Sequence, residues 1–236
     1  ASDVYKRQVN HSTVGPYVAA GWLATVTTAE VPNLANVDAE WFRRVPESAE
    51  HAVPYFWGTT GIAYRTDLVP GGIARWRDLL EPAPGLAGHI AMTTNARDLV
   101  GAALRALGYS MNSTDPAALA AAEALLQKQR PAVRTYTYDL AIKREKSALI
   151  DGSVVAAIAF NGDAAQLRAI EPRVRFVLPA EGAGLWLDFL AVLAQSTRKA
   201  DAYAFLDYLN RPEVAARNAL HVRFASPNVA ASKLLP

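Results

Sequence analysis

The chain has 236 residues, 51% of them hydrophobic, so it can form one large domain or two smaller lobes with real cores. It contains no cysteine, which excludes disulfides, a thiolate metal site and a cysteine nucleophile. Its net charge of +2 gives no sign of the basic surface of a nucleic-acid-binding protein, and no apolar run reaches the ~20 residues of a membrane span.

We do not expect residues 1–8 to belong to the folded protein. Residues 3–8 (DVYKRQ) resemble the translation of a transposase adapter used in sequencing libraries, so we expect residues 1–8 to be a processing scar. On that expectation the gene begins upstream, and the signal peptide that this sequence does not show was lost with the missing N-terminus.

Strand-like and helix-like stretches alternate along the rest of the chain, which predicts an α/β fold. Strands are expected in four apolar stretches: Trp57–Tyr64, His89–Met92, Val154–Phe160 and Val174–Leu178. Helices are expected in six stretches: 95–107, from Pro116 to before Pro131, from about Asn161, Lys199–Asn210, from Pro212 to near Leu220, and the tail through Leu235.

The segment 181–188 (EGAGLWLD) combines an aromatic ring with a carboxylate. If it is extended, Trp186 and Asp188 point to the same face, because strand side chains alternate. A ring face attracts a cation by roughly 0.5–2 kcal/mol, and a carboxylate adds a charge-assisted hydrogen bond. The pair therefore suits an alkyl-ammonium ligand; the alternative is a core tryptophan beside a solvated aspartate.

Five segments together resemble the bacterial polyamine-binding proteins that serve ABC importers of the spermidine/putrescine type, within the extracellular solute-binding proteins. Their order and spacing over about residues 29–236 make the resemblance specific. The segments are 53–61 (VPYFWGTTG), 107–116 (LGYSMNSTDP), 160–163 (FNGD), 179–188 (PAEGAGLWLD) and 224–228 (FASPN).

The resemblance implies a type II periplasmic-binding-protein fold, in which two α/β lobes enclose a ligand cleft and close on the ligand. It places lobe one in residues 9–53 and 184–225, and lobe two in residues 54–183. Residues 226–236 are then the start of a truncated C-terminal segment. Because the first strand–helix units of the family have no counterpart here, lobe one is expected to be incomplete.

The resemblance also implies a ligand site. Asp188 matches the acid that binds a ligand ammonium group in this family, and Trp186 matches the neighbouring aromatic. Phe160 stands where relatives usually have Trp, so it offers a weaker ring face; the alternative is a plain core residue. Asp163 matches a position that is acidic in putrescine-type members; the alternative is a helix N-terminal residue stabilised by the dipole.

Four further positions follow from the resemblance. Asp98 matches a ligand-binding Glu, and Asn95 replaces an Asp of the spermidine-type pattern; helix capping explains both residues equally well. Phe224 matches a Tyr and keeps the aromatic wall without the hydroxyl. Ser12, or its neighbour Thr13, matches a pocket serine of lobe one.

Counting charges favours a putrescine-like diamine. Asp163 and Asp188 can each pair with one ammonium group. A triamine has a third ammonium group, and the position that would supply the third acid is the uncharged Asn95 in this chain. The resemblance implies a periplasmic, monomeric protein whose partners are the polyamine and a membrane permease. We expect no cofactor and no metal.

An enzyme and a ligand-binding sensor are the two alternative classes of protein. Catalysis is disfavoured, because the four histidines lack metal-type spacing and no nucleophile-elbow, Walker A or H-E-x-x-H motif occurs. The same fold also serves as the extracellular sensor domain of membrane signalling proteins, so a ligand-binding sensor stays an alternative to a transport protein.

Overall fold

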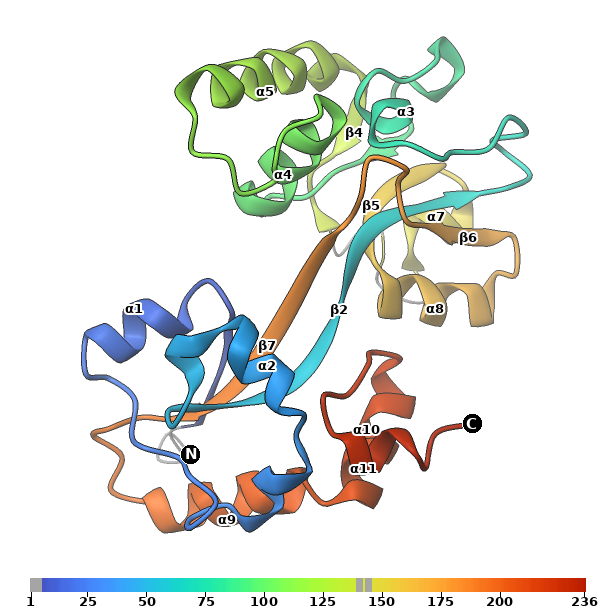
Figure 1. Ribbon diagram of the computed structural model, residues 1–236. Coiled ribbons are helices and arrows are strands. Elements are labelled where there is room, and N and C mark those ends of the chain that lie inside the picture. The colour runs from blue at the N-terminus through green and yellow to red at the C-terminus, as the bar shows by residue number, and fades with distance from the viewer. Residues whose placement is uncertain (1–5, 139–141, 143–145) are drawn as a thin grey trace. The chain divides into compact units, whose positions relative to one another are not determined.

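The computed structural model describes residues 6–138, 142 and 146–236, and the chain divides into two compact units (Figure 1). Unit 1 comprises residues 1–58 and 186–236, and unit 2 comprises residues 59–185. The chain passes from unit 1 to unit 2 within strand β2 (Ala52–Arg65) and returns within strand β7 (Gly184–Val192). The lobe boundaries at residues 54 and 184, and the separate segment 226–236, stay a prediction.

In unit 1, β7 lies between β2 and the antiparallel strand β1 (Lys6–Asn10). The helices of this unit are α1 (Val14–Ala19), α2 (Ala39–Arg44), α9 (Lys199–Leu209), α10 (Pro212–Val222) and α11 (Val229–Ser232) (Figure 1).

The alternation of β7 builds a core on each of its faces. On one face, Leu190 and Val192 pack in a buried cluster with Ala202 and Leu206 of α9. On the other, Leu187, Phe189 and Ala191 pack in a cluster with Val9 of β1 and Val14 of α1. Trp186 and Asp188 are separated from Leu190 by even numbers of residues, so their side chains point to the same face of β7 as Leu190 does.

In unit 2, the strand order is β2-β5-β3-β4, and strand β6 also pairs with β2. Strands β3 (Ile90–Ala91), β4 (Val133–Thr135) and β5 (Ala156–Phe160) are mutually parallel, whereas β5 and β6 (Val174–Val177) run antiparallel to β2.

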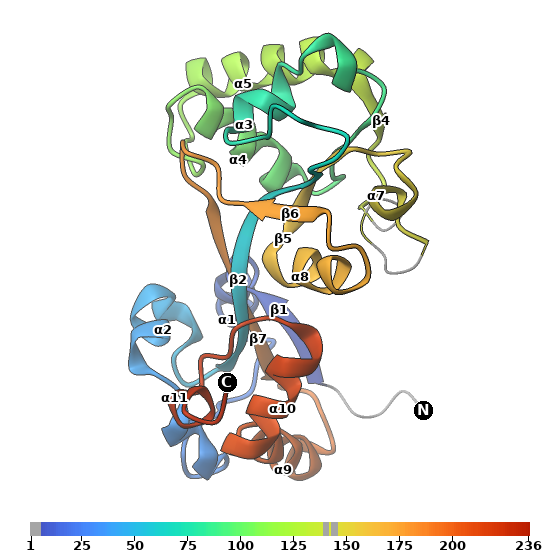
Figure 2. The same ribbon diagram turned by 90° about the vertical axis from the view of Figure 1, so that its right-hand side faces the viewer.

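Helices cover both faces of this part of the sheet. They are α3 (Trp76–Leu80), α4 (Ala96–Ala106), α5 (Pro116–Gln129), α7 (Ala148–Asp151) and α8 (Asn161–Ile170). Helices α3, α4 and α5 pack against one another, while α8 packs against β5 and β6 (Figure 2).

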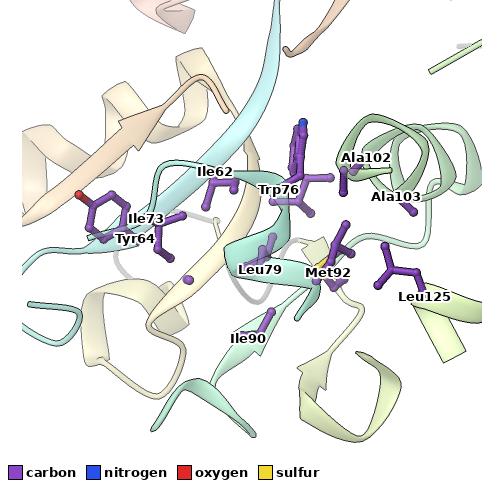
Figure 3. Packing of buried hydrophobic residues seen from close by; sticks show 14 of the residues in the cluster. Ile62, Tyr64, Ile73, Trp76, Leu79, Ile90, Met92, Ala102, Ala103 and Leu125 are labelled. Carbon is purple, nitrogen blue, oxygen red and sulfur yellow. The ribbon is translucent and has the colours of Figure 1, made fainter. Parts of the chain in front are cut away.

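The larger core of unit 2 lies between the sheet and helices α3, α4 and α5. It contains Ile62 of β2, Trp76 and Leu79 of α3, Leu125 of α5, and Met92, which follows β3 (Figure 3). Each of these five side chains is at most 8% exposed. The next residues along β2 and β5 point the other way, into a second cluster with α7 and α8.

Local sequence signals explain the helix starts. The side-chain oxygen of Asn95 accepts hydrogen bonds from the backbone of Arg97 and Asp98, at 3.1 and 3.4 Å, and so caps α4. Asp115 caps α5 in the same way, with Pro116 at the first helical position. Gly108 has φ +85° just after α4, a conformation that favours glycine.

The α/β fold predicted from the sequence is confirmed, and the four expected strands are present. The expected helical tail through Leu235 was wrong, because α11 ends at Ser232 and the chain then turns. Residues 6–8, set aside as adapter-derived, lie in β1, and residues 1–5 lie outside the described residues. The origin of this segment stays a prediction.

Within the described part of the chain, no helix combines the length and the apolar composition that a membrane span requires.

Candidate functional site

The polar residues of unit 2 gather where its parallel strands end. Thr93 and Asp98 follow β3, Tyr138 follows β4, and Asp163 follows β5. The carboxyl ends of parallel strands meet at one edge of a sheet, and open α/β sheets bind ligands outside that edge. The chain order of the strands and helices therefore explains why these side chains come together.

Tyr138 joins two of the predicted site residues. Its hydroxyl donates a hydrogen bond to Oδ2 of Asp163 at 2.7 Å and accepts one from the backbone N–H of Phe160 at 3.0 Å. Its ring lies 5.2 Å from the Phe160 ring, tilted by 44°. Burial, and then the charge of Asp163, raise the pKa of Tyr138, so the phenol stays protonated and remains a donor.

Asp163 is the third residue of α8 and Asp98 is the third residue of α4. Each carboxylate therefore lies in the first turn of a helix, where the helix dipole favours negative charge. Asp98 accepts a hydrogen bond from the buried hydroxyl of Thr60. Burial raises the pKa of Asp98, and the Thr60 hydrogen bond only partly offsets this effect.

Side chains of unit 2 surround a narrow space that is too small to hold a water molecule. Its lining residues are Thr60, Thr93, Asp98, Tyr138, Ile158, Ala159 and Phe160. The acid and the two aromatic rings among them are groups that attract an ammonium group with an attached methylene chain, although the space in this structure does not admit one.

Asn95 is engaged differently. It is exposed, and its side-chain oxygen is used in capping α4. The capping explanation offered by the sequence is therefore what the structure shows, and a ligand contact for Asn95 stays a prediction. The same alternative fails for Asp98, because its carboxylate is directed to Thr60.

In unit 1, Trp186 and Asp188 lie on β7 as expected, two residues apart and both partly buried. Asn10 of β1 is the direct cross-strand partner of Asp188. Cross-strand partners project to the same face of a sheet, so an amide stands beside the carboxylate. Asn10 was not predicted from the sequence, because only the register of β1 against β7 places it beside Asp188.

Phe224 meets Trp186 in unit 1. Their ring centroids are 4.9 Å apart and their planes lie at 86°. Phe224 lies just after α10, where Arg223 takes a left-handed φ of 62° and ends the helix. The next residue, Ala225, exchanges two backbone hydrogen bonds with Trp57, at 3.0 and 3.2 Å, which holds this loop against β2.

Ser12 lies in the turn between β1 and α1. Its backbone N–H and its hydroxyl both donate to Oδ1 of Asn10, at 3.0 and 2.6 Å, and the Thr13 hydroxyl donates to the same oxygen at 3.2 Å. The backbone of His11 donates to Leu187 at 2.9 Å, so the β1–β7 pairing continues toward Ser12. Asn10 thus connects Ser12 with the strand that carries Asp188.

The predicted site residues therefore form two groups. Unit 2 holds Asp163, Phe160 and Asp98, with Tyr138 and Thr60 as residues that the sequence did not indicate. Unit 1 holds the remaining group, which consists of Trp186, Asp188, Phe224, Ser12 and the newly found Asn10. Their ligand-binding roles stay predictions. Among residues 6–138, 142 and 146–236, no cluster of His, Cys, Asp and Glu is suited to a metal ion.

The fold is that of the type II periplasmic binding proteins, a class of two-lobed α/β proteins. The chain matches the bacterial extracellular solute-binding proteins over residues 5–234, and it belongs to that family.

Known proteins resemble the chain over most of its length. It is 32% identical over 217 residues to the spermidine/putrescine-binding periplasmic protein of Escherichia coli, covering 91% of this chain and 61% of that protein. It is 34% identical over 208 residues to the norspermidine sensor of Vibrio cholerae, covering 87% of this chain and 56% of that protein. The chain thus spans about three fifths of the relatives' length.

A solved structure shows the same architecture. The spermidine/putrescine ABC transporter substrate-binding protein PotD of Streptococcus pneumoniae superimposes with a TM-score of 0.84 at 26% identity. The superposition covers 100% of this chain and 72% of that chain.

Proposed function

We propose that the chain is the ligand-binding part of a protein that captures a polyamine in the periplasm and delivers it to an ABC-transporter permease. A putrescine-like diamine is the favoured ligand, the protein acts as a monomer, and no catalytic step is assigned to it. The observation that carries the proposal is that each unit presents a carboxylate beside aromatic rings. Asp163 lies beside Phe160 and Tyr138, and Asp188 shares the face of Trp186.

The chemistry of a diamine supports this assignment. Each ammonium group loses water when it is bound, and a desolvated charge needs an opposite charge or it is strongly disfavoured. Asp163 and Asp188 each provide one carboxylate for such a charge. The methylene chain between the charges is apolar, and the aromatic rings provide both apolar contact and cation–π attraction.

The preference for a diamine rests on the number of acids. Asn95 stands where a spermidine-type relative has an acid, and its oxygen is committed to the backbone of α4. A third ammonium group has one fewer carboxylate to meet here. We therefore expect putrescine to bind more tightly than spermidine.

Calorimetric titration of the complete protein with putrescine and spermidine tests the proposal. Asp188→Asn and Asp163→Asn are each expected to lower putrescine affinity at least tenfold, because a charge-assisted hydrogen bond is worth about 1.5–3 kcal/mol. Asp201→Asn is a matched control, since Asp201 is exposed on α9 and forms an ion pair with Arg198 at 2.7 Å. Unchanged affinity in Asp188→Asn contradicts the site, and tighter binding of spermidine contradicts the diamine preference.

A ligand-binding sensor is the second candidate, and the similarity to the norspermidine sensor of Vibrio cholerae favours it. Uptake of labelled putrescine by cells that carry the complete gene and its neighbouring permease genes separates the two. Uptake that depends on this protein supports transport. Binding without any effect on uptake, together with a ligand-dependent change in a signalling output, supports the sensor.

A further inference from the structure

We infer that Tyr138 is a positioning residue for amine binding, because its hydroxyl fixes the Asp163 carboxylate and ties it to Phe160. The inference rests on the proposed function and adds to it a role for Tyr138 in ligand binding. It concerns unit 2 alone.

The geometry gives Tyr138 a single arrangement. As a donor it reaches Oδ2 of Asp163 at 2.7 Å, a normal distance for an O–H···O hydrogen bond. As an acceptor it receives the N–H of Phe160 at 3.0 Å. An oxygen that both donates and accepts is fixed in position, so the carboxylate bonded to it loses rotational freedom.

The surroundings make that bond effective. Tyr138 is packed against the ring of Phe160, and Asp98 lines the same narrow space between side chains. In a desolvated setting a hydrogen bond is electrostatically stronger than in water. The charges of both Asp163 and Asp98 act on the phenol, and both favour its protonated form. The hydroxyl is therefore a permanent donor over the physiological pH range.

The position of Phe160 relative to Asp163 is set at the start of α8. Phe160 precedes the first residue of α8, and Asn161 at that first position accepts a hydrogen bond from the backbone of Thr59 at 2.9 Å. Tyr138, from the segment that follows β4, adds a second hydrogen bond at the same helix start. An ammonium group bonded to Asp163 is thereby held at a set distance from the ring that contacts its methylene chain.

The consequence is that Tyr138 acts through Asp163. Removing the hydroxyl leaves the charge of Asp163 in place but frees its orientation, so the affinity for a diamine falls. Once Asp163 has no charge, the hydroxyl has little left to orient, and its removal then costs little affinity. This dependence separates a positioning role from a merely structural one.

A double-mutant cycle on the complete protein tests the inference. Putrescine affinity is measured calorimetrically for wild type, Tyr138→Phe, Asp163→Asn and the double variant. We expect Tyr138→Phe to lower affinity about tenfold, and the double variant to bind no more weakly than Asp163→Asn alone. Tyr136→Phe removes a hydroxyl two residues away and is the matched control, with affinity unchanged.

Asp163→Glu provides a test in which Tyr138 is intact. It keeps the charge but moves the carboxylate by one methylene from the hydroxyl, so affinity is expected to fall as in Tyr138→Phe. If Tyr138→Phe binds as wild type does, or if the two losses simply add, the inference is wrong while the proposed function stands. If wild type itself binds no amine, the proposed function fails, and this inference fails with it.

Discussion

The indole ring of Trp186 and the phenyl ring of Phe224 meet edge to face, with centroids 4.9 Å apart and planes at 86°. This geometry places the positive edge of one ring on the negative face of the other, which stabilises aromatic pairs. Trp186 lies on a strand and Phe224 in a loop, so the contact lets a loop orient the ring that the site needs. The backbone bonds between Ala225 and Trp57 keep that loop in place.

Replacing Phe224 therefore tests how far the ring pair supports binding. Phe224→Leu is expected to lower putrescine affinity about two- to tenfold, because an edge-to-face pair is worth about 0.5–1.5 kcal/mol beyond its buried area. Phe224→Tyr keeps the ring and is expected to bind at least as well as wild type. Calorimetric titration of both variants measures the difference, and equal affinity for Leu and Tyr would show that the ring pair is irrelevant to binding.

A second prediction concerns the cross-strand pair of Asn10 and Asp188. Asn10→Asp preserves the shape of the side chain and the oxygen that accepts from Ser12, but it sets two carboxylates directly opposite each other. Like charges at such positions destabilise a sheet, by about 0.2–1 kcal/mol. We expect a lower melting temperature at low ionic strength that recovers as salt is raised.

Asn10→Asp also tests whether Asp188 belongs to a ligand-binding site. If a cation binds beside Asp188, saturating putrescine is expected to raise the melting temperature of Asn10→Asp by more than that of wild type, because the ligand relieves the repulsion. An equal rise in both proteins would indicate that the ligand does not reach this pair. Thermal denaturation with and without ligand at two salt concentrations provides all the comparisons.

These two residue pairs also show where sequence reasoning succeeds and where it ends. Strands such as β5 and capped helices such as α4 are specified locally, by an apolar run and by Asn95 at the helix start, and both were predicted. The placement of Trp186 and Asp188 on one face needs only strand alternation. The assignment of the other site residues depended on resemblance, because nothing local marks Phe160 or Phe224 as more than a core aromatic.

The missed residues were missed for a physical reason. Tyr138 depends on β4, a strand of only three residues whose pairing with β3 cannot be seen in its own composition. Asn10 depends on the register of β1 against β7, two segments separated by most of the chain. Long-range pairing decides both cases, whereas propensity and capping act within one turn or strand.

A third prediction concerns the partly buried carboxylate of Asp98. Burial raises its pKa, which means that the folded protein holds the charged form less favourably than the unfolded chain does. The folded state then binds the proton more tightly, so the Asp98 contribution to stability falls as pH rises above the unfolded value of about 3.9. At neutral pH the charge is therefore a cost to the ligand-free protein.

Asp98→Asn is expected to change stability and binding in opposite directions. The variant removes the desolvated charge and still accepts from Thr60, so its melting temperature without ligand should exceed that of wild type at pH 7 and approach it near pH 3.5. Its affinity for putrescine should fall, because a negative charge close to Tyr138 and Phe160 is gone. A variant that loses both stability and affinity would show that Asp98 is a structural residue instead. Calorimetric titration and thermal melts on the same samples measure both quantities.

The last prediction concerns acid stability and the ion-pair network of unit 2. The guanidinium of Arg173 bonds both carboxylate oxygens of Glu171, at 2.7 and 2.6 Å, and holds the pKa of Glu171 at about 2. Arg173 also pairs with Asp67 at 3.1 Å, and Asp67 with the buried Arg65 at 2.9 Å. Because Arg173 remains 55% exposed, salt screens this network and the effect on stability is expected to be moderate.

The depressed pKa fixes the sign of the pH dependence. The contribution of Glu171 is fully present above the unfolded value of about 4.3 and is lost as pH falls toward 2, where the folded carboxylate takes up its proton. Glu171→Gln should therefore melt below wild type at pH 6, and the two melting temperatures should converge by about pH 2. Glu123→Gln, at an exposed position in the middle of α5 where a side-chain oxygen can still accept from Gln127, should match wild type at every pH. A difference for Glu171→Gln that persists undiminished at pH 2 would mean that its packing, and not the charge of its carboxylate, stabilises this part of unit 2.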